Sequence, residues 1–182
     1  MIPMKPRETI EGFDTFLVER GMTLDAVVIG GTALGLLGVV ARQTRDCDIL
    51  HPELPAEILA AAEQFAKSRR EVGDPLGDDW LNNGPASLAD ALPPGWIDRL
   101  QAAFDGAAIT LRCLGRTDLI RSKIFALCDR GIDLMDCIAL APTEEELDEI
   151  EPWLAIQDLN TKWPAHVRAV LDDLRKRLGH GV

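Results

Sequence analysis

The sequence AVVIGGTALGLLGVVARQTRDCDIL, residues 26–50, holds the signals from which we predict the fold of this chain. It begins with a short apolar run, rich in β-branched residues, that stops at Gly30-Gly31. Runs of this kind that end in glycine are typical of buried strands. The apolar residues 32–38 predict a short helix that Thr32 caps. Residues 46–50 predict a second strand.

Two aspartates stand at the start of that second strand. Side chains alternate between the faces of a strand, so Asp46 and Asp48 share one side while Cys47 and Ile49 point into the core. Two close carboxylates repel each other unless a cation, usually Mg²⁺, lies between them. We therefore interpret Asp46 and Asp48 as metal ligands. The alternative is a strand start with two solvated aspartates.

The glycine pair upstream predicts a contact with a phosphate. Glycine lets the backbone approach a phosphate closely, and amides at the start of a helix are donors for anions. Gly30 and Gly31 would supply the amides, and Thr32 would add a hydroxyl. The alternative is a tight strand-to-helix turn, and the two interpretations are compatible.

A second polar block lies at residues 118–136, with the sequence DLIRSKIFALCDRGIDLMD. Lys123 and Arg130 lie seven residues apart, close to two helical turns, and so share one helix face. Asp133 and Asp136 are either ion-pair partners of these cations or plain surface acids. We expect Lys123 and Arg130 to face the same cleft as the aspartate pair, and Lys123→Ala not to unfold the chain, because an exposed lysine contributes little stability. The alternative is a pair of surface cations on an amphipathic helix.

Together the two blocks resemble the nucleotidyltransferase superfamily with the polymerase-β-like fold. Its signature is a hydrophobic residue, Gly-Gly or Gly-Ser, a spacer, and Asp-x-Asp between hydrophobic residues. Residues 29–31 and 46–49 have this pattern, with a slightly long spacer. The second block is similar to the downstream motif of small bacterial nucleotidyltransferases, the AbiEii-like toxins and a related uncharacterised nucleotidyltransferase-like family. That motif is a lysine on a helix, then an arginine, then Asp-x-x-Asp.

The resemblance implies Mg²⁺-dependent transfer of a nucleoside monophosphate from an NTP to a hydroxyl of RNA or protein. It also implies a place in a toxin–antitoxin or phage-defence pair, with an antitoxin as partner. The implied catalytic residues are Asp46, Asp48 and Lys123, of which Asp46 and Asp48 hold the metal. The implied nucleotide-binding residues are Gly30, Gly31, Thr32 and Arg130.

The sequence departs from the superfamily pattern at one point. Many active members supply a third carboxylate from a later strand, but the strand expected at residues 108–114 contains no acid. Asp78 and Asp79 lie in an irregular stretch and are weak substitutes. The alternative function is therefore a catalytically inactive module that binds a nucleotide or another protein.

Composition limits the function further. The net charge of −11 argues against a broad, non-specific nucleic-acid binder, because such proteins need a basic surface. The four cysteines show no metal-binding spacing and are expected to be reduced core residues. No apolar run approaches the ~20 residues that span a bilayer, and residues 1–6 lack the apolar core of a signal peptide. We expect a cytoplasmic protein with no membrane partner.

The remaining elements complete an α/β, or α+β, fold in which helices flank a small mixed sheet. The resemblance implies a minimal nucleotidyltransferase core at residues 1–140, with a helical extension at residues 141–182 packed on it in a single compact unit. Residues 71–96 are irregular but pinned by Trp80 and Trp96, and Asn82, Asn83 and Ser87 are candidates to line a pocket. Helices are expected at residues 7–20, 55–70, 96–104, 118–129 with Thr117 as cap, 132–140, from Thr143 to about 153, and from Pro164 to Gly179.

Overall fold

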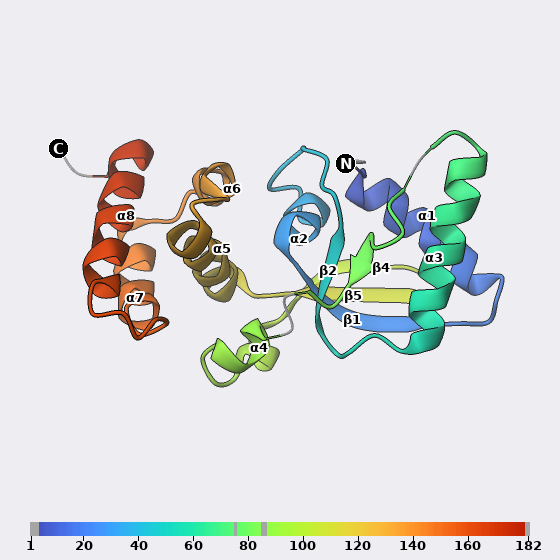
Figure 1. The fold of residues 1–182 in the computed structure, drawn as a ribbon, viewed down its shortest axis with the longest axis horizontal. Helices are drawn as coiled ribbons and strands as arrows, with labels where there is room; N and C mark the ends of the chain where they lie inside the picture. Colours follow the sequence, from blue (N-terminus) through green and yellow to red (C-terminus); the bar gives the residue numbers. More distant parts are fainter. Residues whose placement is uncertain (1–3, 75, 85–86, 181–182) are drawn as a thin grey trace. The chain divides into compact units, whose positions relative to one another are not determined.

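The computed structural model describes residues 4–74, 76–84 and 87–180 of the chain (Figure 1). Two sequence predictions fall partly outside these residues. They concern residues 1–6, where no signal peptide was expected, and the irregular stretch 71–96. By contacts between Cα atoms the chain divides into two compact units, Met1–Leu114 and Gly115–Val182. Each unit is described by itself.

The first unit is built on a mixed, five-stranded sheet in the order β3-β2-β1-β5-β4. In the middle, β1 pairs antiparallel with β2 and parallel with β5. At the edges, β3 runs parallel to β2 and β4 antiparallel to β5. The predicted α+β class with a small mixed sheet is confirmed. The strands are β1 (Leu24–Ile29), β2 (Cys47–His51), β3 (Leu81–Asn82), β4 (Gln101–Asp105) and β5 (Ile109–Cys113).

One face of this sheet is the apolar core of the unit. Val28, Cys47 and Ile49 are all 0% exposed and belong to one buried cluster with alternate residues of β5. The registers Val28↔Ile49 and Val28↔Cys113 place these side chains on the same face. Asp48 is out of phase with them and therefore lies on the opposite face.

Helices α1 (Pro6–Val18) and α3 (Ala56–Glu71) pack on the apolar face and on each other. The ring of Phe13 lies 5.3 Å from that of Phe65 and 5.1 Å from that of Trp80, in centroid distances. Trp80 is completely buried, and its indole N–H donates to the carbonyl of Ala62 at 3.1 Å. Trp80 therefore fixes the irregular stretch to the core, as predicted from the sequence.

The helix predicted at residues 96–104 is wrong in its second half. A short 3₁₀ turn, η1 (Trp96–Arg99), is followed by the strand β4. Pairing with β5 decides this conformation, since Phe104 and Asp105 pair with Leu111 and Thr110. Two helices, α2 (Gly30–Leu36) and α4 (Leu88–Ala91), complete the elements of the first unit.

The second unit is helical throughout its described part. Its four helices contact one another, with α5 packed against α6, α7 and α8. The division between the units therefore falls before α5, whereas the sequence placed a boundary at residue 140. The helices are α5 (Arg116–Arg130), α6 (Leu134–Leu140), α7 (Glu144–Leu154) and α8 (Trp163–Leu178).

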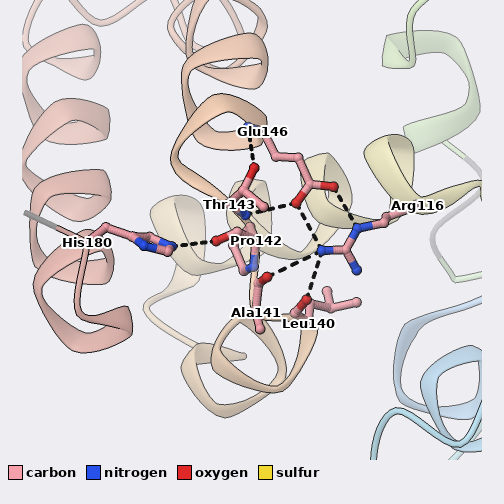
Figure 2. Close-up of polar contacts among 7 residues, drawn as sticks. All are labelled: Arg116, Leu140, Ala141, Pro142, Thr143, Glu146 and His180. Atoms are coloured by element: carbon pink, nitrogen blue, oxygen red, sulfur yellow. Dashed lines mark hydrogen bonds and ion pairs between the residues drawn. The ribbon is translucent and has the colours of Figure 1, made fainter.

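Figure 2 shows polar contacts at the start of α5, the end of α6 and the start of α7, together with His180, after α8, whose Nε2 atom lies 2.7 Å from the Pro142 carbonyl oxygen. The predicted capping box is confirmed: the Thr143 hydroxyl accepts from the Glu146 N–H at 3.2 Å, and the Glu146 carboxylate accepts from the Thr143 N–H at 2.9 Å. The guanidinium of Arg116 donates to that carboxylate at 2.6 and 2.9 Å and to the carbonyls of Leu140 and Ala141. The hydrogen bond from Arg116 lowers the pKa of Glu146.

The start of α5 differs from the prediction, because Gly115 and not Thr117 is the N-cap residue. Arg116, in the first turn of α5, makes the contacts to the ends of α6 and α7 instead. This arrangement ties the N-terminus of α5 to residues about 25–30 positions later in the chain.

Asp14 on α1 joins that helix to the turn between β4 and β5. Its carboxylate accepts hydrogen bonds from the backbone N–H groups of Ala107, Ala108 and Ile109 at 3.1, 2.9 and 2.7 Å. Burial raises the pKa of Asp14 and the three N–H donors lower it, with a net value below the ordinary 3.8. A Cβ at Gly106 would collide with the same carboxylate, so glycine is required there.

We predict that Asp14→Ala lowers the free energy of unfolding by about 2 kcal/mol, because it leaves backbone donors without their charged acceptor. Asp14→Asn, which keeps one carbonyl acceptor, should lose less. Because the folded-state pKa is lowered, the stabilisation is present above the unfolded-state pKa and is lost as the pH falls through the folded-state value. Urea unfolding at pH 7 and at pH 3 measures both effects. Equal stability of parent and Asp14→Ala at pH 7 would contradict this role.

Candidate functional site

The geometry of the candidate site begins where β1 meets β2. The register pairs Ile29 with Asp48, so the residue after β1 lies beside the Asp48 side chain. That residue is Gly30, in the left-handed region at φ 71°. A Cβ built on Gly30 would lie 3.0 Å from the Asp48 Oδ2 atom. Glycine is thus required here both by the backbone conformation and by the closeness of the carboxylate.

The second glycine is required by packing. A Cβ on Gly31 would lie 2.6 Å from the Thr44 Cγ2 atom and 3.7 Å from the Arg42 Nη2 atom. The loop before β2 therefore folds back over the turn between β1 and α2, and it brings a guanidinium group close to the glycine pair. Arg42 is a cation at this turn that the sequence analysis did not single out.

Thr32 holds the backbone of Asp46 in place. It is 1% exposed, and its hydroxyl donates to the Asp46 carbonyl at 2.7 Å. The hydroxyl of Thr44, also buried, lies 3.2 Å from that of Thr32 and 3.3 Å from the same carbonyl. The predicted role of Thr32 as helix cap is wrong, since the N-cap of α2 is Ile29. Thr32 instead positions one of the two aspartates.

Exposure alternates across the aspartate pair as it does along a strand. Asp46 and Asp48 are half-buried, whereas Cys47 between them is completely buried. Burial raises the pKa of the Cys47 thiol, and the negative charges of Asp48 and Asp46 raise it further. Cys47 therefore stays a neutral thiol, in agreement with the expectation that it is a reduced core residue.

Among the described residues, no third acid completes this pair. In residues 4–74, 76–84 and 87–180, no three His, Cys, Asp or Glu side chains gather as a metal site would require. Of the two candidates in the irregular stretch, Asp78 is engaged elsewhere, since its carboxylate lies 2.6 Å from the guanidinium of Arg70. β5 carries no acid, as expected from the sequence.

In the second unit, Lys123 is buried and engaged in ion pairs. It is 4% exposed, and its ammonium lies 2.8 Å from the Asp136 carboxylate and 3.2 Å from that of Asp133. Asp136 is 1% exposed. The interpretation of Lys123 as an exposed cation is therefore wrong, and both aspartates are its ion-pair partners. Asp133 lies just before α6, at φ 71°.

Arg130, the other predicted cation, lies at the last position of α5 and has a largely exposed side chain. The Arg130 Nε atom lies 3.9 Å from the Asp129 Oδ2 atom. Lys123 and Arg130 thus differ in environment although they lie on one helix. Their assignment to the nucleotide remains a prediction.

Residues 9–171 match a protein family described as nucleotidyltransferase of unknown function, DUF6036. The chain belongs to this family. The superfamily inferred from the glycine pair and Asp-x-Asp is thereby confirmed, and membership implies an NTP substrate. No curated protein and no solved structure matched this DUF6036 chain. Among the helices of its described residues, none has the length and apolarity to cross a bilayer.

Two asparagines of the DUF6036 chain, Asn82 and Asn83, lie beside β2 and have different surroundings. Asn83 accepts from the Leu54 N–H at 2.7 Å and donates to the carbonyls of Ile49 and Pro52 at 3.0 and 3.1 Å. It therefore fixes the end of β2. Asn82 is half-buried and pairs with Asp48 in the sheet register.

Sequence reasoning missed Thr44, Arg42 and the relation of Asn82 to Asp48. Thr44 stands two residues before Asp46, and this short spacing is the local signal from which Thr44 could have been found. The position of Asn82 depends on the pairing of β2 with β3, which are far apart in sequence, and no local signal indicates it.

We predict that Lys123→Ala lowers the free energy of unfolding by about 3 kcal/mol, because it leaves the buried Asp136 carboxylate without its partner. Lys123→Met combined with Asp136→Leu should lose less, since it removes both members of the buried Lys123–Asp136 pair. Arg130→Ala is the matched control on the same helix and should change stability by no more than about 0.5 kcal/mol. Urea unfolding measures all three. An unchanged midpoint for Lys123→Ala would show that the ion pair does not stabilise the fold.

Proposed function

We propose that this protein is a Mg²⁺-dependent nucleotidyltransferase that transfers a nucleoside monophosphate from an NTP to a hydroxyl acceptor. The observation that carries the proposal is the position of the Asp48 carboxylate against Gly30, with Asp46 two residues away. Membership of a nucleotidyltransferase family supports it.

Asp46 and Asp48 are the residues that would hold the cation. Mg²⁺ is commonly bound in proteins through one or two carboxylates, and water and substrate phosphates supply the other ligands. Two half-buried carboxylates therefore fit this ion without a third acid. The bound cation would neutralise charge on the triphosphate.

The surrounding residues keep the aspartates accessible and fixed. Because Gly30 has no side chain, no Cβ atom at this position crowds the Asp48 Oδ2 atom. Thr32 and Thr44 hold the Asp46 backbone, so its carboxylate starts from a fixed position. Gly30 and Gly31 are proposed to face the phosphates, and Arg130 to bind the nucleotide, as the resemblance implies. The donor proton of Thr32 is already engaged, so we assign Thr32 to Asp46 and not to a phosphate.

Lys123 keeps its proposed catalytic assignment through the resemblance. Its ammonium already pairs with two carboxylates. Any effect of Lys123 on nucleotide binding must therefore be separated from its effect on stability.

The acceptor is proposed to be a hydroxyl of RNA or of a protein. The resemblance to AbiEii-like toxins supports this acceptor class and a partner antitoxin in a toxin–antitoxin or phage-defence pair. A cytoplasmic location, where NTPs and both acceptors are present, is part of the same proposal. Incubation with each labelled NTP and with cellular RNA or protein identifies the acceptor by the fraction that becomes labelled.

A second candidate is a non-catalytic module that binds Mg²⁺ and an NTP without transfer. The observation in its favour is the absence of a third acid beside Asp46 and Asp48 among the described residues. The two candidates differ in a single measurable property, which is the transfer of label from the NTP to an acceptor.

We predict that the parent protein binds an NTP in the presence of Mg²⁺ and that Asp46→Asn combined with Asp48→Asn abolishes this binding. The amides keep the shape of the carboxylates but remove the charge that holds the cation. They also remove the repulsion between the carboxylates, so the double variant should be at least as stable as the parent without metal. Calorimetry with each NTP, and urea unfolding without metal, measure these effects.

Asp78→Asn with Asp79→Asn is the matched control, because it removes the same charge from the same unit at carboxylates that do not lie against Gly30. It should bind Mg²⁺ and NTP as the parent does. If the parent shows no Mg²⁺-dependent binding of any NTP, the proposed function is wrong. Binding without transfer to any acceptor would favour the non-catalytic module.

A further inference from the structure

We propose that Asn82 supplies a third oxygen to the cation held by Asp46 and Asp48. The inference rests on the proposed function and extends it to a residue on a different strand. It assigns a neutral amide oxygen to the cation, so the protein contributes two negative charges to the site.

The first support is the sheet register. β2 and β3 run parallel, with Cys47 opposite Leu81 and Asp48 opposite Asn82. Residues opposite each other in a sheet point to the same face. The side chains of Cys47 and Leu81 are 0% and 3% exposed and lie in the apolar core. Asp48 and Asn82 therefore share the other face, and both are half-buried.

The second support is independent of the register and comes from Gly84. A Cβ built on Gly84 would lie 2.8 Å from the Asn82 Oδ1 atom and 3.9 Å from the Asp48 Oδ1 atom. The amide oxygen and the carboxylate oxygen thus approach the same point from two strands. The absence of a side chain at Gly84 leaves room beside both.

The Asp48 carboxylate is therefore flanked on both sides. Its Oδ2 atom faces Gly30, at the end of β1, and its Oδ1 atom faces Gly84, which follows β3. Asn82 lies on the side of Gly84. Its orientation is set by a hydrogen bond of 2.6 Å that its Oδ1 atom accepts from the Gly84 N–H. An amide oxygen has two lone pairs, so one is left for a cation.

An amide oxygen is suited to this task. Asn and Gln carbonyl oxygens bind hard cations such as Mg²⁺, Mn²⁺ and Ca²⁺ together with carboxylates. The neighbouring Asn83 is placed differently, because its amide oxygen and amide nitrogen bond the backbone around the end of β2. Asn82 is the one of the two whose oxygen lies beside Asp48.

The test is Mn²⁺ binding to the full chain, measured by calorimetry and by electron paramagnetic resonance without nucleotide. Asn82→Ala should weaken Mn²⁺ binding about tenfold, as loss of a supporting group at a metal site does. Asn82→Asp should tighten it about tenfold, because a third negative charge joins the site. Gly84→Ala should weaken it, since the added methyl group displaces the Asn82 amide.

The matched control is Asn160→Ala in the second unit, where the Asn160 Oδ1 atom accepts from the Lys162 N–H at 3.0 Å in a similar local turn. It should leave Mn²⁺ affinity unchanged. Circular dichroism checks that each variant is folded. If Asn82→Ala does not fold, Asn82→Asp decides, because it keeps an acceptor for the Gly84 N–H.

The outcomes separate this inference from the proposed function. If the parent binds Mn²⁺ and the Asp46→Asn, Asp48→Asn variant does not, the aspartate site stands. Unchanged affinity in Asn82→Ala and Asn82→Asp would then overturn the role of Asn82 alone. If the parent does not bind Mn²⁺, the metal site of the proposed function is wrong and Asn82 has no cation to bind.

Discussion

The candidate site depends on the pairing of β1 with β2, which places the Asp48 carboxylate where a side chain of residue 30 would be. A register slip of one residue would turn Asp48 into the apolar core and Cys47 out of it. Burial of Val28, Cys47 and Ile49 on one face therefore fixes the carboxylate on the other. The apolar core and the polar site are two consequences of one register.

The sequence predicted β1, β2 and the aspartate pair because their signals are local. An apolar run, a glycine pair and an alternating Asp-x-Asp lie within residues 26–50. β3 and β4 were not predicted because their pairing is not local. β3 has two residues, and β4 contains two alanines that suit a helix as well as a strand. Strand pairing with β2 and β5 decides their conformation, and tertiary contacts of this kind override propensity.

Spacing predicted which residues share a helix but not which of them are buried. Lys123 and Arg130 both lie on α5, yet only Lys123 is enclosed with two carboxylates. Thr32 was expected to cap α2, and instead its hydroxyl donates to the Asp46 carbonyl. In both cases the partner lies at least ten residues away. A side chain's spacing on its own element carries no information about such a partner.

The central claim is that Gly30, Asp46 and Asp48 form a site for a cation and a triphosphate. The most direct measurement is a crystal structure of the chain grown with Mn²⁺ and a non-hydrolysable NTP, with the metal located by its anomalous scattering. The account predicts a Mn²⁺ peak within coordination distance of the Asp46 and Asp48 carboxylates, with the triphosphate bound to the same ion. A nucleotide and metal bound elsewhere, with these two carboxylates uncoordinated, would contradict it.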